Sequence, residues 1–205
     1  MKRLLFTILI ILVLPVLYQS TPTETLKLKV FDYLLPKQDP SGYFTILNIT
    51  EEDIDKEGGW PIPRQRLGEI HKQIIDAGAL GVGWVVSFPH PDRFGGDEFF
   101  AESLRYGTSI LASFEYPNQI YPKTVGTVIK GPDVGGMLAK GVVQNTHNLR
   151  TNYIQEGISA APTDVDNLVR RIPLLLKTPD GYVSSFGTEV LKALTGARTY
   201  IIKTS

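Results

Sequence analysis

The chain contains no cysteine, which excludes thiolate metal sites, cysteine nucleophiles and disulfide scaffolds. It also has no excess of charge, because 21 basic side chains balance 21 acidic ones. Nucleic-acid binding needs a basic surface, so no nucleic-acid partner is expected. The sequence has no Gly-x-Ser-x-Gly elbow, Walker sequence or His-Glu-x-x-His motif. The common hydrolase, nucleotide-binding and zinc-protease signatures are therefore missing.

What is present fits a folded protein of moderate size. The 205 residues are 42% hydrophobic and 20% charged, which is close to the globular average. This length and composition predict one domain with a targeting element, and they disfavour disorder and coiled coil.

The first residues have the pattern of an export signal, with Lys2 and Arg3 followed by an apolar run from Leu4 to Tyr18. The run is shorter than the roughly 20 residues that span a bilayer, which favours a cleaved signal peptide. Tyr18, however, stands where cleavage requires a small residue, and we favour an uncleaved signal anchor. We therefore expect a signal segment over residues 1–20, a juxtamembrane segment over 21–40 and an extracytoplasmic domain over 41–205. The N-terminus is expected in the cytoplasm and the chain in the inner membrane, with a periplasmic or extracellular domain.

Hydrophobic periodicity predicts an α/β fold in which a mostly parallel sheet, flanked by helices, is built from a βαβαβ unit. Strand-like segments alternate with amphipathic helices in that unit. The expected strands are 43–49, 80–88 and 108–114, and the expected helices are 64–77 and 97–106. The strand over 80–88 is almost continuously apolar, which is typical of a strand buried on both faces.

The second half of the chain is less regular. A short strand is expected over 141–145, and strands over 168–176 and 182–184 are expected to form a hairpin around Pro179-Asp180-Gly181. An amphipathic helix with Phe186, Val190, Leu191 and Leu194 on one face follows the hairpin. A final strand is expected over 200–203.

No metal or cofactor is predicted. His71, His90 and His147 lack the spacing of metal ligands and are expected to be surface histidines, either solvated or hydrogen-bonded. In an open α/β sheet, ligands bind beyond the carboxyl ends of the strands. This rule nominates six residues for ligand binding: Thr50, Glu51, Arg64, His90, Asp92 and Glu115.

Two motifs are distinctive. The first, Trp60-Pro61-Ile62-Pro63-Arg64, opens a predicted helix, where the prolines stiffen the approach and Trp60 supplies an apolar anchor. In the second, which runs from Asp164 to Leu174, Asp166 and Asn167 suit a turn. Arg170 and Arg171 follow that turn and can pair back with nearby carboxylates before Pro173.

These motifs, in this order, resemble the second type of CHASE domain, an extracytoplasmic sensory domain of bacterial adenylate cyclases, histidine kinases and serine/threonine kinases. The matching stretches lie between about Phe31 and Leu194: Ile46 to Glu52, Trp60 to Arg64, Ala77-Gly78-Ala79, Leu80 to Phe88 and Asp164 to Leu174. The chain departs from the family pattern at Thr50, at Gly83 and Trp84, and at Asn167. The resemblance implies structural or motif roles for Trp60, Pro61, Pro63, Arg64, Asp164, Asp166, Arg170, Arg171 and Pro173.

The resemblance implies the sensory domain of a transmembrane receptor. It also implies that the chain corresponds to the amino-terminal two-thirds of such a domain and lacks the output domain. The expected partners are an unidentified small ligand or protein signal, a second copy in a homodimer, and the membrane through the N-terminal segment. No catalysis is expected of the chain itself. Two alternatives remain open: a membrane-anchored exported α/β enzyme and a non-signalling structural remnant.

Overall fold

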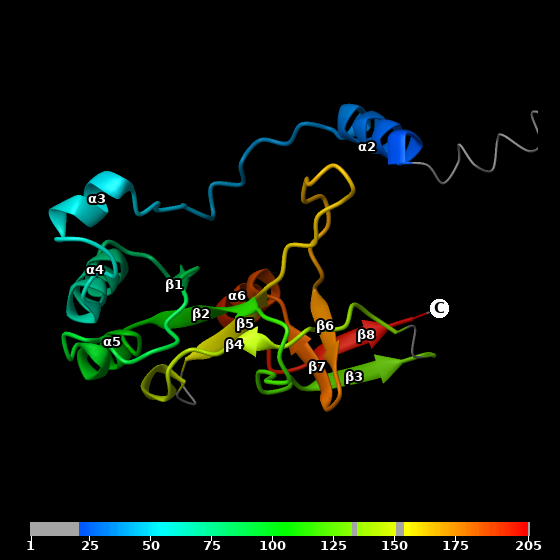
Figure 1. Cartoon of the computed structure of the whole chain (residues 1–205). Helices are drawn as coiled ribbons and strands as arrows, with labels where there is room; N and C mark the ends of the chain where they lie inside the picture. Colours follow the sequence, from blue (N-terminus) through cyan, green and yellow to red (C-terminus); the bar gives the residue numbers. More distant parts are fainter. Residues whose placement is uncertain (1–20, 133–134, 151–153, 205) are drawn as a thin grey trace, which may run out of the picture. The chain divides into compact units, whose positions relative to one another are not determined.

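The computed structural model describes residues 21–132, 135–150 and 154–204 (Figure 1). The chain divides into two compact units. Unit 1 comprises Met1–Asn48 and Pro162–Arg171, and unit 2 comprises Ile49–Ala161 and Ile172–Ser205. The predicted signal segment, residues 1–20, lies outside the described residues. Within the described ranges, no helix combines the length and apolarity needed to cross a bilayer.

Unit 1 contains helix α2 (Thr21–Leu34) and the loop of residues 162–171. Residues 36–48 after α2 form no helix or strand. The strand predicted over 43–49 is therefore wrong. Its aromatic and β-branched residues suit a strand, but a strand exists only where another strand pairs with it, and none does so within the described ranges. The side chains of Tyr43, Phe44, Ile46 and Leu47 are exposed.

Unit 2 is built on a four-stranded sheet with β2 (Thr108–Glu115) at its centre. Strands β1 (Gly81–Trp84) and β5 (Gln155–Ser159) both pair with β2 in parallel, and β4 (Val142–Val143) pairs with it antiparallel (Figure 1). The mostly parallel sheet is thereby confirmed. The predicted βαβαβ unit is wrong in its first strand, and β1, α5 (Asp97–Ser103) and β2 form a single βαβ unit. Strand β1 is shorter than the predicted 80–88 and pairs with β2 alone among the described strands. The continuous burial predicted over 80–88 is wrong, because Leu80 and Val85, on either side of β1, are exposed.

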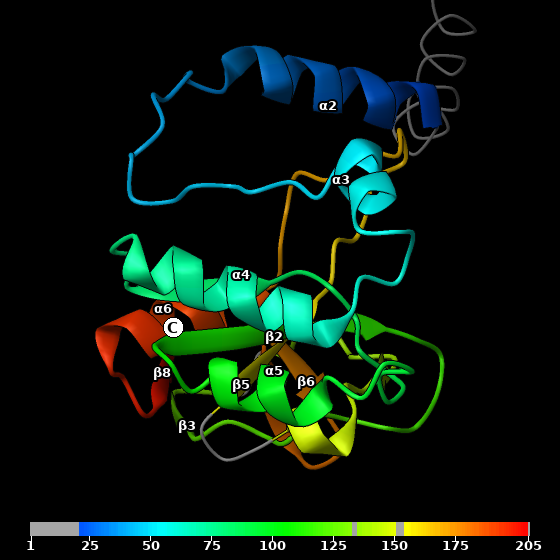
Figure 2. The ribbon, with the colours of Figure 1, turned by 90° about the vertical axis from the view of Figure 1, so that its left-hand side faces the viewer.

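Helices cover both faces of this sheet. Helix α4 (Arg64–Asp76) confirms the prediction over 64–77, and it packs against α5 (Asp97–Ser103), as Figure 2 shows. Both helices share a hydrophobic cluster with Trp84 of β1. On the opposite face, Gly83 and Gly157 lie against Phe186 of α6 (Phe186–Thr195). The absence of a side chain at these glycines lets α6 lie close to the sheet.

The remaining elements complete unit 2. Helix α3 (Glu51–Lys56) precedes α4, and the 3₁₀ helix η1 (His147–Leu149) follows β4. Strands β6 (Leu175–Thr178) and β7 (Gly181–Ser184) form the predicted hairpin. Strand β3 (Thr127–Lys130) pairs in parallel with β8 (Tyr200–Lys203), which confirms the final strand. The strand predicted over 168–176 is wrong before Leu175, because residues 168–171 belong to the loop of unit 1.

Unit 2 has two hydrophobic clusters. The first joins the sheet to α4 and α5, and its most deeply buried members are Phe100, Leu104, Leu111 and Leu149. The second lies around β4, β5, β6 and β7 and contains Val142, Ile158, Leu176 and Val183. These clusters hold the carboxyl ends of β1 and β2 in place, where ligand-binding residues were predicted.

Candidate functional site

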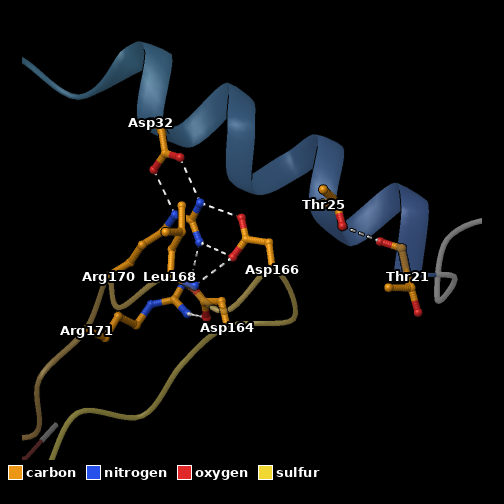
Figure 3. A network of polar contacts seen from close by, with 8 residues as sticks. All are labelled: Thr21, Thr25, Asp32, Asp164, Asp166, Leu168, Arg170 and Arg171. Carbon is orange, nitrogen blue, oxygen red and sulfur yellow. Dashed lines mark hydrogen bonds and ion pairs between the residues drawn. The ribbon is translucent and has the colours of Figure 1, made fainter.

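An extensive polar network in the described part of unit 1 surrounds Arg170 (Figure 3). We call Asp32, Asp164, Asp166, Arg170 and Arg171 the Arg170 cluster. A guanidinium group carries five N–H donors in a planar fork, which matches the geometry of carboxylates.

Arg170 contacts three carboxylates. Its Nε and Nη2 each donate to Asp32 over 2.7 Å. Its Nη1 and Nη2 donate to the two oxygens of Asp166 over 2.8 and 2.7 Å, and Nη1 also reaches Asp164 over 3.1 Å. Two of these three carboxylates are thus bound in the bidentate manner that gives arginine–carboxylate pairs their strength.

The loop backbone explains how the carboxylates converge on Arg170. Asn167 adopts a φ of 62°, the left-handed conformation that asparagine tolerates better than most residues. The turn is closed by two backbone hydrogen bonds, from Asn167 N to Asp164 O and from Asp164 N to Leu168 O. The predicted turn at Asp166 and Asn167, and the pairing of the following arginines with carboxylates, are therefore confirmed. No local pattern pointed to Asp32, which lies 138 positions before Arg170.

The electrostatics of the Arg170 cluster favour its charged form. Hydrogen bonds from Arg170 lower the pKa of Asp166 to about 2 and also lower the pKa of Asp32. Hydrogen bonds to Asp32 and Asp166 in turn raise the pKa of Arg170 above its usual value. The Arg170 side chain is only 5% exposed, whereas that of Arg171 is 72% exposed and makes one longer contact of 3.4 Å with Asp164. Arg170 is therefore a structural clamp between α2 and the loop, and Arg171 is a peripheral member.

Unit 2 contains a second network, which we call the Arg64 cluster: Arg64, His90, Asp92 and Asp97. The buried Arg64 guanidinium pairs with Asp97, donates to the backbone carbonyl of His90, and lies 5.2 Å from the centre of the Phe88 ring. Burial lowers the pKa of Arg64, and the charge of Asp92 opposes this shift. The first residues of α4 and α5, Arg64 and Asp97, are thereby joined.

Asp92 has a supporting role in the Arg64 cluster. Its Oδ2 accepts hydrogen bonds from the backbone N–H groups of Arg64, over 3.0 Å, and Gly96, over 3.1 Å. Its own N–H donates to Asp97 over 2.8 Å. Asp92 therefore satisfies the first amide of α4, which has no partner within the helix. Of the six predicted ligand-binding residues, Arg64, His90 and Asp92 come together here, although His90 takes part through its main chain.

The other three predicted residues lie apart from the Arg64 cluster. Thr50 caps α3 in a reciprocal pair with Asp53, and the exposed Glu51 is the first residue of that helix. Both were expected after a strand, and they begin a helix instead because Thr50 and Asp53 form a capping box there. Glu115 ends β2, and its buried Oε1 has no hydrogen-bond partner in the described part of the chain. No hydrogen bond or ion pair within the described ranges joins these three residues to Arg64.

The motif from Trp60 to Arg64 differs from the expectation that Trp60 is its apolar anchor. Trp60 is exposed and its peptide bond to Pro61 is cis, while Ile62 is the buried anchor of this segment. Pro63 stands at the cap position of α4, as the stiffened approach to the helix predicts. Pro173 lies in unit 2, two residues before β6.

The sequence also missed two buried polar networks of unit 2. His71, expected at the surface, is fully buried: its Nδ1 accepts from Trp84 Nε1 and its Nε2 lies 3.2 Å from Ser109 Oγ. Asn145 joins three segments, because it accepts from Phe88 N and donates to Ala112 O and to Glu156. An amphipathic spacing shows which helix face is apolar, but it does not show that a polar side chain will find partners there.

No group of three or more histidine, aspartate or glutamate side chains in the described ranges could hold a metal ion. No curated protein and no solved structure matches the chain. The CHASE2 domain family, in contrast, matches residues 7–204, nearly the whole chain. The chain therefore belongs to the CHASE2 domain family, a family of extracytoplasmic sensory domains.

Proposed function

We propose that this chain is the signal-input domain of a bacterial transmembrane receptor. Its N-terminal segment anchors it in the inner membrane with the N-terminus in the cytoplasm, and its output domain lies outside residues 1–205. The chain binds a small ligand or a protein signal and has no catalytic activity of its own. Family membership supports the sensory part of this proposal.

The observation that carries the proposal is the Arg170 clamp on α2. A receptor must connect its signal-binding domain firmly to the segment that enters the membrane, because a ligand acts only by changing the balance between two arrangements. Helix α2 follows the apolar run that ends at Tyr18. The loop of residues 162–171 continues at both ends into unit 2, toward β5 and β6. Arg170 and Asp32 thus provide a direct connection from that loop to the juxtamembrane helix.

Ligand binding is proposed at the carboxyl ends of β1 and β2. The polar groups of Arg64 and Asp92 are engaged with protein partners. The exposed His90 side chain and the Glu115 carboxylate, whose Oε1 has no partner in the described ranges, are the groups best able to receive a polar ligand.

A chimera tests the coupling. A transcription activator that works only as a dimer is fused before Met1, and the detergent-solubilised chain is screened with amino acids, sugars, nucleotides and phosphate. We expect a compound that raises the melting temperature without being consumed and that changes reporter output in cells. Arg170→Ala should abolish the change in output but preserve the stabilisation, and the exposed Arg171→Ala should preserve both. Turnover of the compound would instead support the exported enzyme, and a ligand response that survives Arg170→Ala would contradict the clamp.

A further inference from the structure

One face of helix α2 is engaged with the loop of residues 162–171 through Asp32. Leu28 and Asp32 are four residues apart and therefore lie on the same side of the helix. Leu28 is buried, and Asp32 binds Arg170 with both carboxylate oxygens. Figure 3 shows Asp32 directed at the Arg170 guanidinium from the helix above it. The clamp therefore fixes which side of α2 faces the loop.

The opposite side of α2 carries an apolar stripe. Leu26, Val30 and Tyr33 are 62%, 49% and 88% exposed. Their spacing of four and then three residues places them in one row, as in the seam of a two-stranded coiled coil. At 100° per residue this row lies about 160° around the helix axis from Leu28. The row is thus apolar and directed away from the face that the clamp holds. Leu34 and Phe31, which are 70% and 42% exposed, add apolar surface outside the row.

The residues before α2 identify the occupant of this stripe. The apolar run from Leu4 ends at Tyr18, and α2 begins at Thr21. In two copies anchored by that run, both α2 helices start at the same height above the membrane, so they meet parallel and in register. Membrane anchorage also raises the effective concentration of one helix near the other. This matters because a helix of 14 residues is only marginally stable alone.

The charge of α2 argues against the membrane surface as the occupant. Its charged residues are Glu24, Lys27, Lys29 and Asp32, which sum to zero. Helices that lie on membranes usually gain from basic residues that attract anionic lipids. Helix α2 has no such excess, and Asp32 is already engaged by Arg170.

We infer that α2 is a dimerisation element, which pairs in parallel with α2 of a second copy through Leu26, Val30 and Tyr33. The Arg170–Asp32 ion pair holds the helix so that this stripe faces the partner. This inference rests on the proposed function for the membrane anchorage that brings the two helices into register.

Because the chain has no cysteine, single cysteines can be introduced without background. The full chain is expressed in bacterial membranes with one cysteine at Leu26, Val30 or Tyr33, or at the control positions Glu24 and Lys27. Disulfide formation is then measured after mild oxidation. We expect dimers to form several-fold more readily at the stripe positions than at the controls. In Arg170→Ala membranes this difference should diminish, because the helix is free to rotate.

Equal cross-linking at all five positions, or a preference for Glu24 and Lys27, would overturn the inference. A second result would also overturn the inference: the stripe cysteines do not cross-link in membranes, and a maleimide reagent reaches them only after detergent is added. That result would place the stripe on lipid. Labelling of Glu24→Cys in intact cells with a membrane-impermeant maleimide separates the two proposals. If Glu24→Cys is labelled in intact cells but the stripe cysteines do not cross-link, the extracytoplasmic sensor proposal is retained and the pairing of the two α2 helices is contradicted. A protein that labels only after permeabilisation contradicts the extracytoplasmic sensor, while its cross-linking pattern still tests the pairing.

Discussion

Arg170 connects residues that are far apart in the sequence through the geometry of its side chain. Its planar fork binds Asp32 and Asp166 with two hydrogen bonds each. Lysine carries the same charge as a compact point with three donors, so it cannot reproduce two bidentate contacts at once. We therefore expect Arg170→Lys to keep the net charge of the cluster but to lose the bidentate contact with Asp32 that attaches α2 to the loop.

Hydrogen exchange of the peptide covering residues 21–35 measures this loss. The α2 amides should exchange several-fold faster in Arg170→Lys than in the parent protein. Arg171→Lys is the matched control and should leave exchange unchanged, because Arg171 is mostly exposed and its contact with Asp164 is long, at 3.4 Å. Unchanged exchange in Arg170→Lys would show that α2 is held by other contacts.

His71 should make stability depend on pH. Burial lowers the pKa of the folded imidazole below its ordinary 6.5. As pH falls through 6.5, the imidazole of the unfolded chain binds a proton while the folded imidazole stays neutral. The free energy of unfolding therefore decreases. Stability is then fully present above pH 6.5 and decreases below it, by up to about 1.4 kcal/mol per pH unit, until the folded pKa is reached. Denaturant unfolding at pH 7.5 and pH 5.5 measures this loss.

The hydrogen bonds of His71 explain why protonation is unfavourable. Nδ1 accepts from Trp84, and Ser109 Oγ donates to the carbonyl of Leu104, so the Nε2–H form of neutral His71 suits both neighbours. A second proton on Nδ1 would face the indole N–H. In His71→Gln this part of the pH dependence should disappear, whereas substitution of the exposed His147 by Gln should leave it in place. An undiminished slope in His71→Gln would assign the pH dependence to other groups.

For individual side chains, partners close in the sequence were predicted better than distant ones. The turn from Asp164 to Arg170 was predictable because its partners are within a few positions of one another. Asp32 and Asp97 were not predictable, since each meets its arginine only after the chain has folded.

At the scale of elements, the packing of α6 on β5 depends on Gly157. A Cβ at this position would lie 2.6 Å from Phe186 Cα, a backbone atom that cannot move aside like a side chain. Gly157→Ala should therefore destabilise unit 2 by roughly 1–3 kcal/mol, the usual cost of overpacking. Chemical denaturation followed by circular dichroism measures this change.

Gly187 provides the matched control, because nothing lies within 4 Å of the Cβ that alanine would add. Gly187→Ala should be neutral or stabilising by up to about 1 kcal/mol, since it lies in the first turn of α6 and alanine favours a helix. Equal stability of the two variants would mean that α6 can shift away from β5 at little cost.

The elements that the sequence predicted correctly are those with local signals. Helix α4 has apolar spacing and a glycine after its end, and α6 has a serine cap whose side chain accepts from Thr188 N. Strand β5 was missed because it begins with Gln155 and Glu156 and shows no apolar run. Its Glu156 is satisfied by Asn145 and Ser113, which come from other segments.

At the scale of the whole molecule, residues 36–48 connect α2 to unit 2 without a helix or strand of their own. Their exposure makes them the expected first site of proteolysis, because proteases need an extended chain of several residues. Chymotrypsin cleaves after aromatic residues, and Tyr43 and Phe44 are 89% and 67% exposed. Phe100 in α5, by comparison, is fully buried.

We therefore expect chymotrypsin to cut the detergent-solubilised full chain first after Tyr43 or Phe44. The fragment that begins at Phe44 or Thr45 should then unfold in one cooperative transition, because it retains both hydrophobic clusters of unit 2. Mass spectrometry of the early products and circular dichroism of the fragment test both parts. A Tyr43→Ser, Phe44→Ser double variant should be cut more slowly at this segment. Early cleavage inside β2 would contradict an ordered unit 2, and resistance after Tyr43 and Phe44 would mean that this segment pairs as a strand in solution after all.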